Sequence, residues 1–108
     1  MMQYKVIFFV LMACAVILEV IADIFFKKWG LGSKGYVLIA GLVLYFIGTV
    51  FWAISLKYEM LSKAISIFTI LNLILVVGAG AIIFKDQLSL WNKIGILLGM
   101  ISVILIEI

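Results

Sequence analysis

The sequence predicts an all-α membrane protein: four transmembrane helices joined by short loops, working as a dimer, with an antiparallel arrangement favoured. Hydrophobic residues make up 69% of the 108 residues and charged residues 12%, and the mean hydropathy is +1.45. A soluble domain of this size buries only about 60–70% of its surface, so it could not hide so much apolar surface from water. The charged residues also gather in short segments that divide the chain into four apolar stretches.

Each apolar stretch has the length of a membrane span, which takes about 20 residues. We expect one four-helix domain over residues 1–108, with spans over about 5–27, 35–56, 62–84 and 89–107. Loops of only a few residues make consecutive helices antiparallel neighbours. No small-residue cleavage site follows the first stretch, so we expect a retained helix and not a signal peptide.

Polar residues mark where each stretch ends. Residues 6–26 are apolar except for two acids, and Lys27 and Lys28 close the span, followed by a turn that contains Gly30 and Gly32. Residues 35–56 and 64–84 carry no charge, and the last stretch has Lys93 near its start. Aromatic residues near the span ends fit an interfacial belt: Tyr4, Trp29, Tyr36, Trp52, Tyr58 and Trp91.

Glu19 is the most informative residue, because it lies inside an apolar span. An ionised carboxylate at that depth costs at least a few kcal/mol, so such residues are kept mainly for ion, proton or substrate binding. The alternative is a protonated, hydrogen-bonded Glu that joins two helices. Asp23 lies one turn later on the same helix face. It either pairs with Lys27 at the membrane surface or adds a second acid to a central chamber, where a polyamine would suit the paired charges.

Two further spans carry lines of polar or small residues. The second span aligns Gly41, Tyr45, Gly48 and Trp52, so that two glycines flank a Tyr hydroxyl. The third span aligns Ser62, Ser66, Thr69 and Asn72, with Phe68 one turn before Asn72. An amide in the middle of a membrane helix needs a partner, so Asn72 is either a strut between helices or a ligand contact.

The fourth span offers small residues at helical spacing, namely Gly95, Gly99 and Ser102. Such residues let two backbones approach closely. They form either the contact of a dimer or a packing face against another helix of the same chain. Three lysines fall on one side of the membrane and five on the other, a bias slight enough for insertion in both orientations.

Glu19 in the sequence Leu18-Glu19-Val20-Ile21, followed by Lys27, Tyr45 and Gly95 at matching spacings, resembles the small multidrug resistance family of the drug/metabolite transporter superfamily. The resemblance covers essentially the whole chain and implies a divergent member. Phe68 stands where the family typically has Trp, Ile70-Leu71-Asn72 replaces a Gly-x-Gly stretch, and Asp23 replaces an uncharged residue.

The resemblance implies a proton-coupled antiporter that exports small organic cations by alternating access. Quaternary ammonium, guanidinium-like and polyamine compounds are the expected classes. Glu19 would be shared by protons and substrate in a homodimer of the inner (plasma) membrane, although a heterodimer stays open. The expected binding residues are Glu19, Asp23, Tyr45, Phe68 and Asn72, with Trp52, Ser66 and Thr69 as secondary candidates.

Two other functions stay open: a subunit of a lipid-linked sugar flippase, and a small pore-forming or accessory membrane protein. Tolerance of Glu19→Gln would favour the latter. The sequence has no nucleophile–base pair, metal-ligand cluster or phosphate-binding loop, so we expect no enzyme, no cofactor and no metal site. Its lysines are spread as interfacial anchors, so we expect no nucleic-acid partner.

Overall fold

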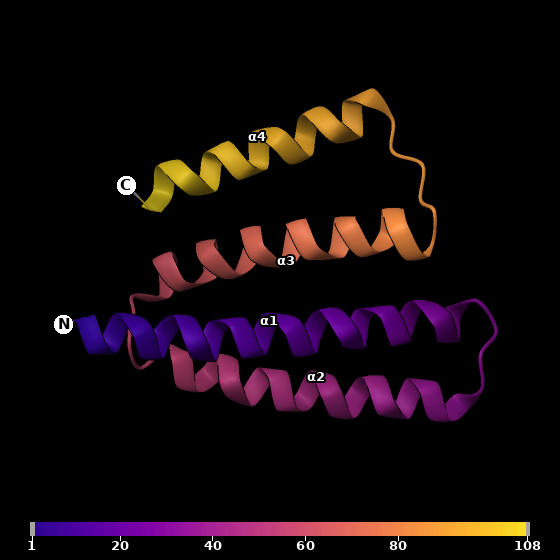
Figure 1. The fold of residues 1–108 in the computed structure, drawn as a ribbon, viewed down its shortest axis with the longest axis horizontal. Helices are drawn as coiled ribbons and strands as arrows, with labels where there is room; N and C mark the ends of the chain where they lie inside the picture. Colours follow the sequence, from indigo (N-terminus) through magenta and orange to yellow (C-terminus); the bar gives the residue numbers. More distant parts are fainter. Residues whose placement is uncertain (1, 108) are drawn as a thin grey trace. The chain divides into compact units, whose positions relative to one another are not determined.

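In the computed structural model, which describes residues 2–107, the chain folds into four α-helices: α1 (Met2–Gly30), α2 (Gly35–Ser55), α3 (Leu61–Ile83) and α4 (Leu90–Glu107) (Figure 1). The prediction of an all-helical protein is confirmed. The helices form two units, one ending at Met60 and the other starting at Leu61. Each unit is a pair of consecutive antiparallel helices (Figure 1).

Three helices are long and apolar enough to cross a membrane: α1 from Gln3, α2 and α3. This agrees with a multi-pass membrane protein. The fourth predicted span differs, because its apolar part, Leu90–Ile106, is shorter than a usual span.

A pair of reciprocal hydrogen bonds explains where α4 begins. The Ser89 hydroxyl accepts a bond from the Asn92 backbone N–H, and the Asn92 side-chain oxygen accepts one from the Ser89 backbone N–H, each at 3.1 Å. This arrangement resembles a capping box, with Asn in place of Glu or Gln. The cap places Ser89 before the first helical turn, so Leu88 is left in the loop.

The first helix is longer than its apolar stretch. It extends over 29 residues, beyond the predicted limits of 5 and 27 at both ends. Lys27 and Lys28 occupy its last turn, where positive charge favours the helix dipole. The helix then stops in a Schellman turn: Gly32 has a φ of 107°, its N–H bonds to the Trp29 carbonyl, and the Ser33 N–H bonds to the Lys28 carbonyl.

Glycines set the contact between α1 and α2. Gly41 and Gly48 are buried on α2, two turns apart. A Cβ added at Gly41 would lie 2.8 Å from the Phe26 ring, and one at Gly48 would lie 2.9 Å from Cγ of Glu19. Both glycines therefore let the two helices approach more closely than any larger residue would.

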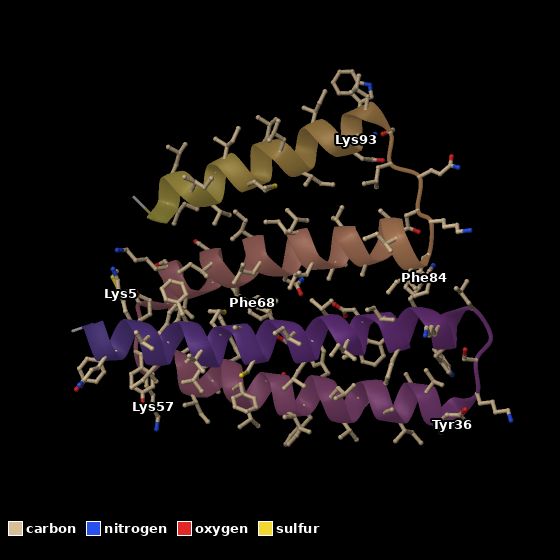
Figure 2. All side chains as sticks on the ribbon, viewed as in Figure 1. Lys5, Tyr36, Lys57, Phe68, Phe84 and Lys93 are labelled. Carbon is tan, nitrogen blue, oxygen red and sulfur yellow. The ribbon has the colours of Figure 1, made fainter. Side chains whose placement is uncertain are left out.

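The ends of the α1–α2 unit carry the predicted polar and aromatic residues. Lys5 and Lys57 lie at one end of this helix pair and Tyr36 at the other (Figure 2). The Tyr4 and Tyr58 rings stack with centroids 6.0 Å apart, which ties the segment after α2 to the start of α1. Buried apolar side chains are concentrated on α1 and include Phe8, Met12 and Val16.

The α3–α4 unit is joined by a loop in which Asp86 folds back over α3. The Asp86 N–H donates to the Gly80 carbonyl at 3.0 Å, and its carboxylate oxygen Oδ2 would lie 2.5 Å from a Cβ added at Gly80. Lys85 adopts a positive φ of 53° to make this turn. Phe84 and Lys93 lie at this loop end of the unit (Figure 2).

Candidate functional site

Glu19 is buried on α1 with one carboxylate oxygen unsatisfied. The residue is only 6% exposed, and its Oε2 is buried with no hydrogen-bond partner. Buried polar atoms nearly always have such a partner, and a buried acceptor without one is costly. Gly48 of α2 lies directly against this side chain, where even a methyl group would meet both the Glu19 Cγ and, at 3.2 Å, the Ala15 carbonyl oxygen. Glu19 is therefore part of the close contact between α1 and α2.

Tyr45 brings a hydroxyl to the same place from α2. Its hydroxyl group lies near the Glu19 carboxyl group. Tyr45 is one turn from Gly48, and its ring is tilted against Phe26, with centroids 6.2 Å apart. The side chain is also 44% exposed. Tyr45 thus lies beside the buried acid and is also partly exposed on the surface of the unit.

Asp23 is half-buried on the same side of α1. Its charge acts on both Glu19 and Tyr45, so the three side chains form one cluster, here called the acid–tyrosine cluster. Asp23 forms no ion pair with Lys27 in the described part of the chain; Lys27 is exposed at the end of the helix. The described residues thus show no Asp23–Lys27 ion pair, and a place for Asp23 in a central chamber stays a prediction.

A shallow apolar groove adjoins the cluster within the α1–α2 unit. Its lining residues are Phe26, Leu42, Tyr45, Phe46 and Thr49. The Thr49 hydroxyl donates to the Tyr45 carbonyl oxygen of its own helix at 2.9 Å. Aromatic and aliphatic walls beside carboxylates can hold a cation that carries apolar groups, since π faces attract positive charge.

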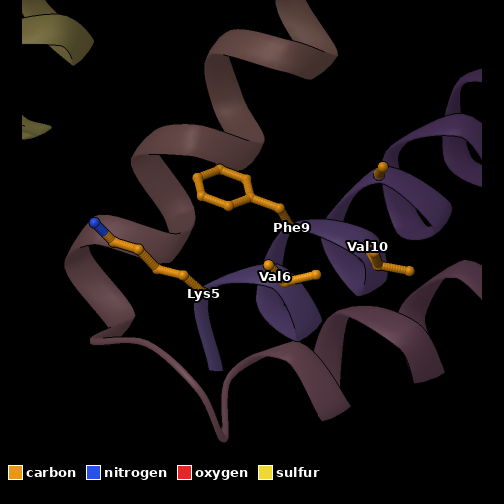
Figure 3. A pocket seen from close by; sticks show the side chains of 5 residues that line it. Lys5, Val6, Phe9 and Val10 are labelled. Atoms are coloured by element: carbon orange, nitrogen blue, oxygen red, sulfur yellow. The ribbon is translucent and has the colours of Figure 1, made fainter. Parts of the chain in front are cut away.

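A second groove lies along the first half of α1, on residues 5–13 (Figure 3). It is lined by Lys5, Val6, Phe9, Val10 and Ala13. These residues include no acid, and none belongs to the acid–tyrosine cluster. This groove does not extend the candidate site.

The candidates on α3 belong to the other unit, which is described by itself. Ser66 is 7% exposed, and its hydroxyl donates to the Ser62 carbonyl oxygen at 2.7 Å, so its own helix satisfies it. Thr69 is exposed, whereas Phe68 and Asn72 are half-buried. Their roles in binding stay predictions. Trp52 on α2 is half-buried, and its carbonyl oxygen accepts a bond from the Ser55 hydroxyl.

The small residues of α4 lie on one side of the helix but differ in exposure. A Cβ at Gly99 would contact the Leu73 side chain of α3 at 3.9 Å. Gly95 and Ser102 are exposed, and the Ser102 hydroxyl bonds to the Leu98 carbonyl oxygen of its own helix at 2.9 Å. Gly99 thus packs within the chain, while Gly95 and Ser102 leave a face for the predicted dimer contact.

Sequence reasoning missed the aromatic residues Phe26 and Phe46. Phe26 follows Glu19 by seven residues and Asp23 by three, so helical spacing places it on the acid-bearing face. That spacing was a usable signal. Phe46 gave no such signal, because nearly every position of α2 is apolar.

Among the described residues, no group of three or more His, Cys, Asp or Glu side chains is arranged to hold a metal ion. Cys14 is a free, half-buried thiol on α1. No protein-family model, curated protein or solved structure matches the chain.

Proposed function

We propose that this protein is a proton-coupled antiporter that exports small organic cations. The observation that carries the proposal is Glu19: a carboxyl group 6% exposed in an apolar helix pair, with Oε2 lacking any hydrogen-bond partner. An acid in this setting is stabilised either by a proton or by a cation, because burial disfavours the unpaired charge. Proton and cation therefore exclude one another at this group.

Exchange follows from that exclusion. A cation that reaches Glu19 displaces its proton, and a proton that returns from the other side of the membrane displaces the cation. Tyr45 lies near the carboxyl group and borders the apolar groove through which substrate arrives. If the protein changes its open side only when Glu19 is occupied, an inward proton gradient drives the cation outward.

The working unit in this proposal is a homodimer in the inner membrane, with two copies of Glu19 and an antiparallel arrangement. Four helices alone would hardly enclose a chamber, and a second copy would supply further walls. Glu19, Tyr45 and Gly95 at their observed spacings support membership of the small multidrug resistance family, as a divergent branch.

Reconstitution tests the proposal. In proteoliposomes on a solid-supported membrane, a concentration jump of an organic cation should evoke a transient current in wild type. Lowering the pH should raise the half-saturating cation concentration, because protons compete for Glu19. The Glu19→Gln variant should lose the current, since an amide carries no exchangeable proton and no charge at this position.

Glu59→Gln provides the matched control. It makes the same carboxylate-to-amide change in the segment between α2 and α3, where the Glu59 carboxylate accepts a bond from the next backbone N–H. Its current should equal that of wild type. An undiminished current in Glu19→Gln would overturn the proposal.

A further inference from the structure

The groove on the first half of α1, here called the α1 groove, has no part in the proposed antiport. It has a volume of about 500 Å³, within the range of small-ligand sites. Lys5, Phe9 and Ala13 follow one another at four-residue spacing and form one ridge of side chains. Val6 and Val10 form the next ridge (Figure 3). Ridges at this spacing leave a groove between them on the surface of an α-helix.

One wall of the α1 groove is held in place by packing. The Phe9 ring meets the Phe8 ring nearly edge to face, with centroids 5.3 Å apart, and Phe8 is only 1% exposed. Phe9, Val6 and Val10 are themselves exposed. The groove therefore offers a fixed aromatic wall and an open apolar surface to whatever lies beside α1.

The α1 groove runs inward from the membrane surface. Lys5 directly precedes the apolar stretch of residues 6–26, so it lies at the edge of the hydrocarbon layer when that stretch crosses it. The distance along the helix from Lys5 to Ala13 is about 12 Å, at 1.5 Å per residue. One leaflet of a hydrocarbon layer about 30 Å thick is about 15 Å deep. The groove thus covers most of the depth that the acyl chains of one leaflet occupy.

Positive charge gathers at the outer end of the α1 groove. Lys5 and Lys57 lie at the same end of the helix pair (Figure 2), and the stacked rings of Tyr4 and Tyr58 tie the segment that contains Lys57 to the start of α1. Within residues 2–60, neither lysine forms an ion pair. The carboxylate of Glu59 accepts a bond from the next backbone N–H. The two ammonium groups are therefore available to an anionic group at the membrane surface.

We propose that the α1 groove binds an anionic phospholipid, with its phosphate on Lys5 and one acyl chain along Phe9 and Val10. Such a lipid supplies both parts that the groove requires, a negative charge at the level of Lys5 and an apolar chain directly beneath it. Lysines near a membrane surface attract anionic headgroups. The lysine distinguishes this groove from the remaining apolar surface of α1, which any lipid can cover. The inference does not depend on the proposed antiport.

Photo-crosslinking of the wild-type protein in vesicles tests the inference directly. The vesicles consist of dioleoyl phosphatidylcholine with a trace of phosphatidylglycerol that carries a diazirine on one acyl chain, and mass spectrometry maps the labelled residues. Labelling should be concentrated on residues 6–13. Unlabelled phosphatidylglycerol should compete at least about fivefold better than phosphatidylcholine, the effect of one lysine charge near a membrane surface. Glycerophosphoglycerol, which is the headgroup without acyl chains, should not compete.

Lys5→Gln tests the charge at the outer end of the groove. It should lower labelling by the phosphatidylglycerol probe about fivefold and leave labelling by a matching phosphatidylcholine probe unchanged. Lys5→Arg, which keeps the charge, should retain the labelling. Lys34→Gln is the matched control, because it removes an exposed lysine from the turn between α1 and α2. It should leave labelling of the groove unchanged.

Ala13→Leu tests the apolar part of the groove. The larger side chain fills the inner end between the two ridges, so labelling of the groove by both probes should fall. Ala53→Leu makes the same change at an exposed residue of α2 outside the groove and should leave the labelling unchanged. Competition between the two lipids on the wild-type protein keeps the inference testable even if a variant fails to fold.

Each contrary outcome overturns a stated part of the inference. Even labelling along the exposed residues of α1 and α2 would show ordinary lipid contact and overturn the site. A groove that stays unlabelled beside labelled neighbours would show that protein covers it, which also overturns the site. Equal competition by both lipids, or undiminished labelling in Lys5→Gln, would overturn the headgroup preference. Competition by glycerophosphoglycerol would overturn the role of the acyl chain.

Discussion

Glu19 packs where it does because Gly48 has no side chain. Gly48 lies so close to α1 that any Cβ would meet Glu19 Cγ at 2.9 Å and the Ala15 carbonyl oxygen at 3.2 Å. The first of these atoms belongs to the acid itself, near its backbone, so it cannot swing away as the tip of a long side chain can. Gly48 is therefore a positioning residue for the proposed proton site.

Gly48→Ala should lower the cation-evoked current about tenfold and destabilise the protein by about 1–3 kcal/mol, because the added methyl group overpacks the helix contact and displaces Glu19. Solid-supported membrane currents and thermal unfolding in detergent measure the two effects.

Gly41→Ala is the matched comparison on the same face of α2. Its methyl group would meet the outer edge of the Phe26 ring at 2.8 Å, and that ring can move. A similar loss of stability with a smaller loss of current is expected. Equal losses of current in both variants would show that general helix packing, and not the position of Glu19, limits transport.

At the scale of helices, hydrogen bonds at the helix ends determine where a helix begins and ends. Hydropathy alone does not predict these limits. The α1 helix runs on past its apolar stretch until Gly32 terminates it, and α4 starts only where Ser89 and Asn92 cap each other. These local bonds satisfy backbone groups that a helix end leaves without partners.

Ser89→Ala should fray the start of α4 and cost about 1 kcal/mol, the usual value of a lost N-cap. Hydrogen–deuterium exchange should become faster over the first turn of α4. Ser102→Ala removes a hydroxyl from the same helix that bonds only to the Leu98 carbonyl oxygen, so it should leave exchange at the start unchanged. Unchanged exchange in Ser89→Ala would show that the Ser89–Asn92 cap does not determine where α4 begins.

Composition and charge spacing were enough to predict four helices and their approximate ends. They could not predict which faces meet, because helices that are apolar nearly all round give no strong amphipathic signal. Glycines at positions 41 and 48 supplied part of that information, since a membrane helix uses small residues where backbones approach. The sequence could not tell whether Asp23 pairs with Lys27, because Glu19 and Lys27 both lie four residues from Asp23.

At the scale of the whole molecule, most large apolar side chains face outward. Phe46 is 70% exposed, Ile82 79% and Leu105 66%, values that suit a lipid environment and not water. Lipid does not force apolar surfaces together, so the proposed dimer would depend on close packing of small residues and on hydrogen bonds between helices. Gly95 and Ser102, exposed on α4, offer such a contact.

Gly95→Leu should weaken self-association at least about tenfold, because a large side chain separates the backbones of the proposed dimer. Analytical ultracentrifugation in detergent measures the effect. Ala81→Leu enlarges an exposed small residue of α3 and should leave association unchanged. A Gly95→Leu variant that dimerises like wild type would place the dimer contact elsewhere.

The length of α1 has a consequence for the surrounding membrane. With a rise of 1.5 Å per residue, its 29 residues reach about 43 Å. A hydrocarbon layer about 30 Å thick is therefore thinner than this helix is long. Across such a layer α1 must tilt or extend its lysine-bearing ends among the headgroups, so a change in the length of the lipid acyl chains should change its tilt.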